Sequence, residues 1–103
     1  DEALEYFEKI ASLDPHNASI HLFIGMSCFL GNKGLERSET ALKRSLKEGL
    51  TDSLAAYAYY FLGEIALKKG RLDEAIQHWE KAAKLNPKLE EPKKQLAKYK
   101  KKQ

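Results

Sequence analysis

The stretch that decides the fold is Gly63–Lys94, "GEIALKKGRLDEAIQHWEKAAKLNPKLEEPKK". A glycine opens it, a second glycine stands seven residues later, and Asn86-Pro87 ends its second apolar run. Apolar residues recur at spacings of three and four, which is the pattern of helices that bury one side. The stretch therefore predicts a helical hairpin. If the rest of the chain repeats this hairpin, a binding function is expected; if it does not, catalytic residues have to be sought.

Helix signals continue through the rest of the chain, and no run alternates as a strand would. We predict helices over residues 1–13, 17–30, 35–48, 54–69 and 72–85, and a sixth from near 90 toward 101. Prolines and glycines stand between them, and Thr51, Asp52 or Ser53 can cap the fourth helix. Because the connections are short, successive helices are expected to be antiparallel.

The hairpin has a counterpart upstream. The pattern Tyr59-x-x-Leu62-Gly63-x-x-Ala66 is matched by His21-x-x-Ile24-Gly25-x-x-Cys28. Pro15 and Pro87 stand 72 residues apart, which is two periods of 36. A spacing of this size is typical of an array of stacked helix pairs.

On these residues the chain resembles the tetratricopeptide repeat family, whose unit is a helix pair of about 34 residues. The resemblance covers residues 1 to about 89, and the best copy runs from Ala56 to Leu89. The copy before it is degenerate, with His21 where a large aromatic residue is usual and Ser38 where alanine is usual. The resemblance implies an all-α fold: a right-handed superhelical stack of antiparallel helix pairs, an α-solenoid.

We interpret residues 1–103 as one such domain. It would hold the second helix of a truncated first repeat (1–15), a degenerate repeat (16–52), a well-matched repeat (53–88) and a basic C-terminal capping helix (89–103). Gly25 and Gly63 would let paired helices approach closely, while Leu42 and Trp79 would fill the space between them. Each pair leaves an apolar face uncovered, so stacking completes the core.

The charge of the chain is unevenly placed. The net charge is +3, yet residues 84–103 alone carry eight lysines and two glutamates. This tail has no arginine and only one aromatic residue, Tyr99, so we interpret it as the solvated face of the cap and expect no nucleic-acid partner. We also expect no membrane span, because no apolar run is long enough, and no signal peptide is visible. A cytoplasmic location is favoured.

Residues that could carry a reaction are scattered. Three histidines and the single cysteine, Cys28, show no metal-ligand spacing, and one cysteine cannot form an internal disulfide. No nucleophile–base arrangement stands out, and Asp73-Glu74 suits a helix N-terminus without a catalytic role. We therefore predict no catalytic residue, no metal and no cofactor, and hence no enzyme.

Two stripes of side chains, one on the first helix of each pair, are more informative about function. At about 100° per residue, four side chains of the later pair share one face, and four of the earlier pair occupy the equivalent face. In the tetratricopeptide family this face lines a concave groove that holds peptides. By that resemblance, the groove for a protein or peptide partner would consist of Ser19, Leu22, Met26, Phe29, Tyr57, Tyr60, Glu64 and Leu67.

Two classes of function stay open. The first is a binding module for an apolar or amphipathic segment of another protein. The second is a structural segment whose groove is filled by the chain itself or by a second copy, which allows homodimerisation. In either case we do not expect the carboxylate clamp that holds the acidic tails of heat-shock chaperones. The clamp positions carry no cation here and include Glu64, which repels a carboxylate.

Overall fold

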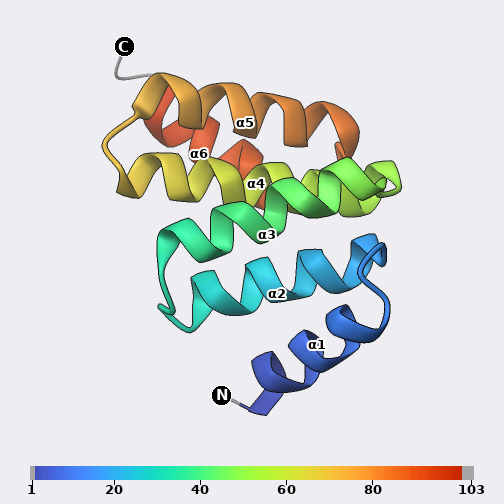
Figure 1. The fold of residues 1–103 in the computed structure, drawn as a ribbon. Helices are drawn as coiled ribbons and strands as arrows, with labels where there is room; N and C mark the ends of the chain where they lie inside the picture. Colours follow the sequence, from blue (N-terminus) through green and yellow to red (C-terminus); the bar gives the residue numbers. More distant parts are fainter. Residues whose placement is uncertain (1, 101–103) are drawn as a thin grey trace. The chain divides into compact units, whose positions relative to one another are not determined.

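The computed structural model describes residues 2–100, and every regular element in that range is a helix (Figure 1). The all-α prediction is confirmed. The helices are α1 (Glu2–Leu13), α2 (Ala18–Leu30), α3 (Leu35–Glu48), α4 (Asp52–Lys68), α5 (Leu72–Leu85) and α6 (Glu90–Tyr99). The predicted end of the last helix near Lys101 lies outside the described residues.

Two of the helices, α2 and α4, begin at a side-chain cap. The Asn17 side chain accepts a hydrogen bond from the backbone N–H of Ile20 at 3.1 Å, so α2 starts one residue later. At α4, Thr51 is the cap among the three candidates, since its Oγ1 accepts from the N–H of Leu54. Gly49 and Gly70 stand after α3 and α4 with φ of 101° and 77°, a conformation that glycine adopts without strain.

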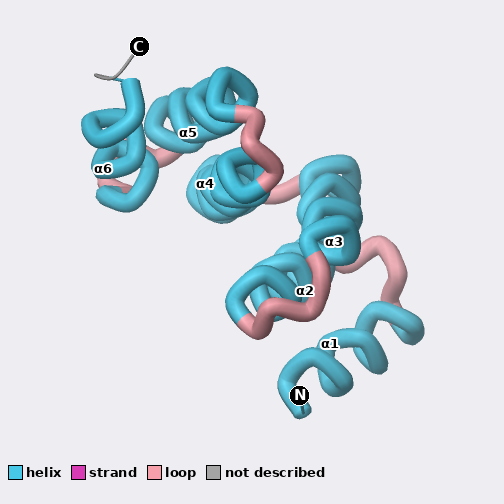
Figure 2. The backbone as a smooth tube through the Cα atoms, turned by 90° about the vertical axis from the view of Figure 1, so that its left-hand side faces the viewer, coloured by secondary structure: helices cyan, strands magenta, loops and turns pink. Residues whose placement is uncertain are grey.

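The chain divides into two compact units, with the boundary between Leu50 and Thr51. The first unit holds α1, α2 and α3, and α2 packs on both of the others (Figures 1 and 2). Its core includes Leu4, Ile24, Cys28 and Ala41, with Phe7 packed against them. Each helix of this unit therefore contributes to one shared core.

The second unit holds α4, α5 and α6. Helix α5 packs on α4, and α6 lies beside α5 (Figure 2). The core around Ala66, Ala75, Ile76 and Trp79 receives Leu96 and Tyr99 from α6, and Leu89 packs on Ala56 and Ala82. Helix α6 thus turns Leu96 and Tyr99 toward the core of this unit.

Each unit contains a close helix crossing of the same kind, as the repeat predicted. A Cβ added at Gly25 would lie 2.6 Å from Cδ2 of Leu42, and one added at Gly63 would lie 2.5 Å from Cδ1 of Trp79. Both distances are far inside van der Waals contact, so any larger residue at either position would force a neighbour to move. Leu42 and Trp79 are fully buried at the equivalent places of α3 and α5.

The degenerate Ser38 has a structural explanation. It is fully buried at the position where the second unit has Ala75, and its hydroxyl donates a hydrogen bond to the carbonyl of Gly25 at 2.7 Å. A buried hydroxyl is costly unless it is hydrogen-bonded. The close approach at Gly25 supplies an acceptor, so serine is tolerated where the family pattern has alanine.

Candidate functional site

The α2 stripe consists of Ser19, Leu22, Met26 and Phe29. Leu22 is buried, with 1% of its surface exposed, whereas the other three side chains are half-buried. The surface that this stripe offers therefore comes chiefly from Met26 and Phe29. A thioether and a ring adapt well to an apolar partner.

Helix α2 also exposes apolar side chains that the stripe did not include. Phe23 is 37% exposed and Leu30 is 71% exposed. The Phe23 ring lies 5.6 Å from that of Phe7 on α1. The helix is apolar on nearly every side, so a wheel drawn from a single helix did not reveal which apolar residues its neighbours leave uncovered.

The α4 stripe consists of Tyr57, Tyr60, Glu64 and Leu67. Tyr57 is the most open member, with 36% of its surface exposed, and the other three are half-buried. Tyr60 and Leu67 pack against the core of the second unit. The stripe therefore grades from an open tyrosine at one end to side chains built into the core.

Helix α6 covers part of the α4 stripe. The Nε2 amide of Gln95 donates a hydrogen bond to Oε2 of Glu64 at 2.6 Å. Near it, the Tyr99 ring stacks on Trp79 at a centroid distance of 5.6 Å. A wheel drawn for α4 alone could not find this contact, because its partner lies 31 residues further along the chain.

Burial and two acidic neighbours act together on Tyr60. Burial, together with the smaller effects of the charges on Glu64 and Glu91, raises the pKa of the Tyr60 hydroxyl to about 12. The hydroxyl therefore stays protonated at any physiological pH. It is a hydrogen-bond donor at the covered end of the stripe.

The titratable side chains elsewhere do not gather into a reactive site. Among residues 2–100, no group of three or more histidine, cysteine or acidic side chains is placed to hold a metal ion. Cys28 is buried, and burial raises the pKa of its thiol. His16 is exposed and hydrogen-bonds Glu48, as expected of a surface residue, whereas His78 is half-buried and stacks on Tyr59.

Membrane insertion has no candidate segment in the described part of the chain. None of the helices between residues 2 and 100 combines the length and the apolar content that a bilayer crossing requires.

The closely packed hairpins α2–α3 and α4–α5, each with a glycine at its crossing, define a helical-repeat protein. The family model of the tetratricopeptide repeat matches residues 56–89, which is the copy that the sequence pattern singled out. The chain thus carries a tetratricopeptide repeat. Such repeats are generally non-catalytic modules for protein–protein interaction, so the chain has the fold of an interaction scaffold.

Similarity to another protein extends beyond that one copy of the repeat. Protein bimA of Emericella nidulans is 34% identical over 87 residues, which is 84% of this chain. The chain spans about a tenth of the length of that relative, since the matched part is 10% of it. The similarity therefore concerns a segment of bimA and not its whole length.

Proposed function

We propose that the chain is a non-catalytic scaffold that binds an apolar or amphipathic segment of a partner protein through the α2 and α4 stripes. The observation that carries the proposal is the exposure of Tyr57. Its large ring is 36% exposed, whereas the other large apolar side chains of α4 are buried or half-buried. An exposed large ring beside other apolar side chains is a common mark of an interface. Met26 and Phe29 supply the corresponding half-buried surface on α2.

The chemistry of the stripes indicates which partners they suit. Tyrosine buries a large ring with little loss of side-chain entropy and keeps a hydroxyl for hydrogen bonding. No cation stands in either stripe, and the one charge is Glu64. The stripes therefore favour an apolar segment over an acidic tail, and they offer no cation to neutralise the phosphates of a nucleic acid.

A second candidate function is favoured by α6. This helix already contacts Glu64, and its Leu96 and Tyr99 pack on the same core as Tyr60 and Leu67. The α4 stripe is thus partly filled from within the chain. In this alternative the stripe serves folding, or its open end at Tyr57 pairs with a second copy of the chain.

Site-specific cross-linking separates the two candidates. A photoreactive phenylalanine analogue would replace Tyr57, and in a matched control it would replace the exposed Lys47 on α3. In cell extract, we expect position 57 to cross-link a different protein and position 47 to give no specific product. A product containing two copies of this chain supports self-association instead. Equal labelling at both positions contradicts a site at Tyr57.

Affinity for the cross-linked partner provides the quantitative test. Tyr57→Ala is expected to weaken binding by about 2 kcal/mol, roughly thirtyfold in Kd, if the ring is a hot spot. Because Tyr57 is exposed, the substitution should leave the thermal unfolding midpoint near that of the parent. A variant that binds normally, or that unfolds at a clearly lower temperature, contradicts the proposed role.

A further inference from the structure

A hollow of about 460 Å³ lies between α2 and α3, entirely within the first unit. We call it the α2–α3 hollow, and it is lined by His21, Ile24, Arg37, Thr40, Ala41 and Arg44, with Glu36 at one end. Neither stripe contributes to it. It is a separate candidate site, independent of the function proposed above.

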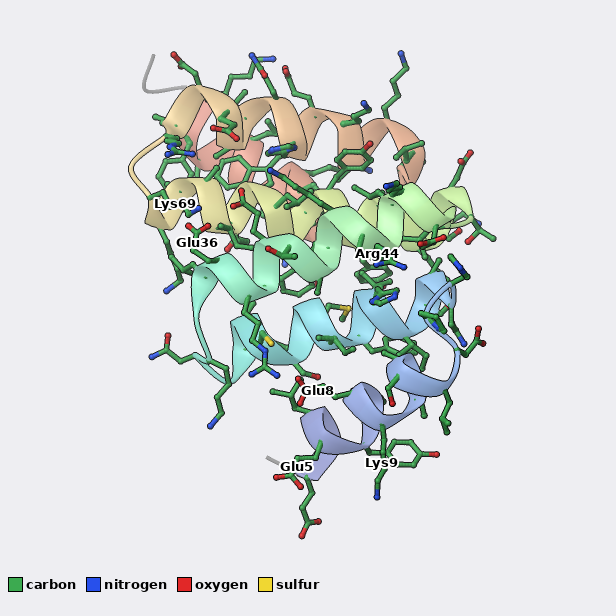
Figure 3. All side chains as sticks on the ribbon, viewed as in Figure 1. Glu5, Glu8, Lys9, Glu36, Arg44 and Lys69 are labelled. Carbon is green, nitrogen blue, oxygen red and sulfur yellow. The ribbon has the colours of Figure 1, made fainter. Side chains whose placement is uncertain are left out.

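The floor of the hollow is apolar, and its rim carries two arginines and one glutamate. Ile24 and Ala41 form the floor, each 8% exposed. Arg37 and Arg44 stand at the rim, two helical turns apart on α3, with side chains 46% and 40% exposed. Figure 3 labels Arg44 on α3 together with Glu36, the acidic residue next to Arg37.

Both arginines have partners within the unit, yet both keep donors for a ligand. Arg37 pairs with Glu8, which Figure 3 shows on α1. Arg44 donates from Nε to Glu48 at 2.5 Å and from Nη2 to the carbonyl of Pro15 at 3.0 Å. A guanidinium has five N–H donors, and surface ion pairs contribute only about 0–1 kcal/mol. An added carboxylate can therefore share or replace these pairs at little cost.

The second unit has a hollow at the equivalent place, and its chemistry differs. It is about 640 Å³ and is lined by Tyr59, Glu74, Gln77, His78 and Lys81. Matching the Leu42 and Trp79 crossings puts Glu74 where the first unit has Arg37, and His78 where it has Ala41. The Tyr59 ring stacks on His78 and carries the Lys81 ammonium over its face at 4.9 Å. This second hollow has neither the aliphatic floor nor the arginine pair.

We propose that the α2–α3 hollow binds an acidic peptide segment of a partner protein, with one aliphatic side chain on Ile24 and Ala41 and two carboxylates at Arg37 and Arg44. The apolar floor would have no use for a purely ionic ligand, and the arginine rim would have none for a purely apolar one. Charge complementarity therefore selects a segment that carries both kinds of group.

The spacing of the arginines indicates the order of these groups. Arg44 stands seven positions after Arg37 on α3, which is about 10.5 Å along the helix. In an extended peptide, residues i, i+2 and i+4 face one side and span about 13 Å. Flexible side chains bridge the small difference. The expected pattern is acidic–x–aliphatic–x–acidic.

A binding titration with defined peptides tests the proposal. The probe is a fluorescein-labelled nine-residue peptide with leucine at its centre, glutamate two residues to each side, and glycine or serine elsewhere. One control peptide has lysine for both glutamates, and another has serine for leucine. We expect the probe to saturate below about 1 mM, and each control to bind at least tenfold more weakly. Absence of saturation by the probe, or equal binding of a control, overturns the proposal.

Variants of the chain locate the binding. Thr40 is exposed and lines the hollow, so Thr40→Phe should fill the hollow without touching the core. We expect Thr40→Phe, and the double variant Arg37→Gln with Arg44→Gln, each to weaken probe binding at least tenfold. Arg71→Gln, which removes an exposed arginine from the second unit, should change it less than twofold. Unchanged binding by Thr40→Phe refutes the site, even if the arginine variants fold poorly.

The same titration distinguishes this site from the stripes. Tyr57→Ala should leave binding of the acidic probe unchanged, because Tyr57 does not line the hollow. A loss of probe binding in Tyr57→Ala would move the site to the α4 stripe and overturn the inference. The function proposed for the stripes is tested separately, by the cross-linking at position 57.

Discussion

Replacing Gly63 by alanine tests the close crossing of α4 and α5 in the second unit. The added Cβ would lie 2.5 Å from Cδ1 of Trp79 and closer still to its Nε1. Carbon atoms in contact ordinarily stand about 3.5–4.0 Å apart, so the ring or the helix must move by about 1 Å. The Trp79 ring is rigid and fully buried, which leaves no easy direction for that movement.

The magnitude follows from two opposing effects. Overpacking of this kind costs about 1–3 kcal/mol, and replacing a helical glycine by alanine returns about 1 kcal/mol of helix propensity. We therefore expect Gly63→Ala to lower the free energy of unfolding by up to about 2 kcal/mol, and Gly63→Leu to lower it by about 1–3 kcal/mol or more. Urea unfolding followed by far-UV circular dichroism measures both changes.

Two controls make the result decisive. A Gly and Ala pair at the exposed Gln77 of α5 measures helix propensity without a crossing. Trp79→Leu opens space at the crossing, so Gly63→Ala should cost less in that background than in the parent. If Gly63→Ala is stabilised by as much as the Gly and Ala pair at position 77 predicts, or if its effect adds to that of Trp79→Leu without coupling, the close-approach argument is wrong.

Three further predictions concern recognition, pH and the degenerate repeat. An acidic tail peptide of the kind held by carboxylate clamps should show no saturable binding to the stripes at micromolar concentrations, since the stripes carry no cation and include Glu64; saturation that is lost in Tyr57→Ala would contradict this. Because the pKa of Tyr60 is raised to about 12 in the folded chain, stability is retained below the unfolded value of about 10 and falls as the pH rises from there toward 12. Tyr60→Phe should remove part of that loss, and alkaline unfolding curves identical to the parent's would exclude it. Ser38→Ala removes one buried hydrogen bond to Gly25 and should cost no more than about 1 kcal/mol by urea unfolding, because that carbonyl can keep its bond within α2; a cost of several kcal/mol would show that the hydroxyl has a larger role.

The sequence predicted the helices well because their ends are set locally. Leu35–Glu48 and Leu72–Leu85 were predicted to the residue, since glycine, proline and helix propensity act within a turn of the end. The choice of Thr51 over Asp52 as the cap needed coordinates, because both side chains can accept the same bond. The right-handed superhelical arrangement and the single-domain interpretation stay predictions.

The candidate site was predicted less completely, for a physical reason. A helical wheel shows which residues share a face but not what covers that face. The bond from Gln95 to Glu64 joins helices far apart in the chain, and the 1% exposure of Leu22 depends on packing that no local pattern encodes. The α2–α3 hollow was not predicted, for the same reason. Its lining comes from two helices, and its combination of apolar and charged groups exists only where the two helices meet.

The burial of Trp79 has an optical consequence. It is the one tryptophan of the chain, it lies in the second unit, and it stacks on Tyr99 of α6. Its fluorescence therefore reports the unfolding of α4, α5 and α6 and does not report on the helices before Leu50. The helical dichroism signal, in contrast, is the sum over the helices of both units. If the denaturation curves followed by tryptophan fluorescence and by helical dichroism superimpose, the two units unfold as one cooperative unit. If the curves separate, each unit unfolds on its own.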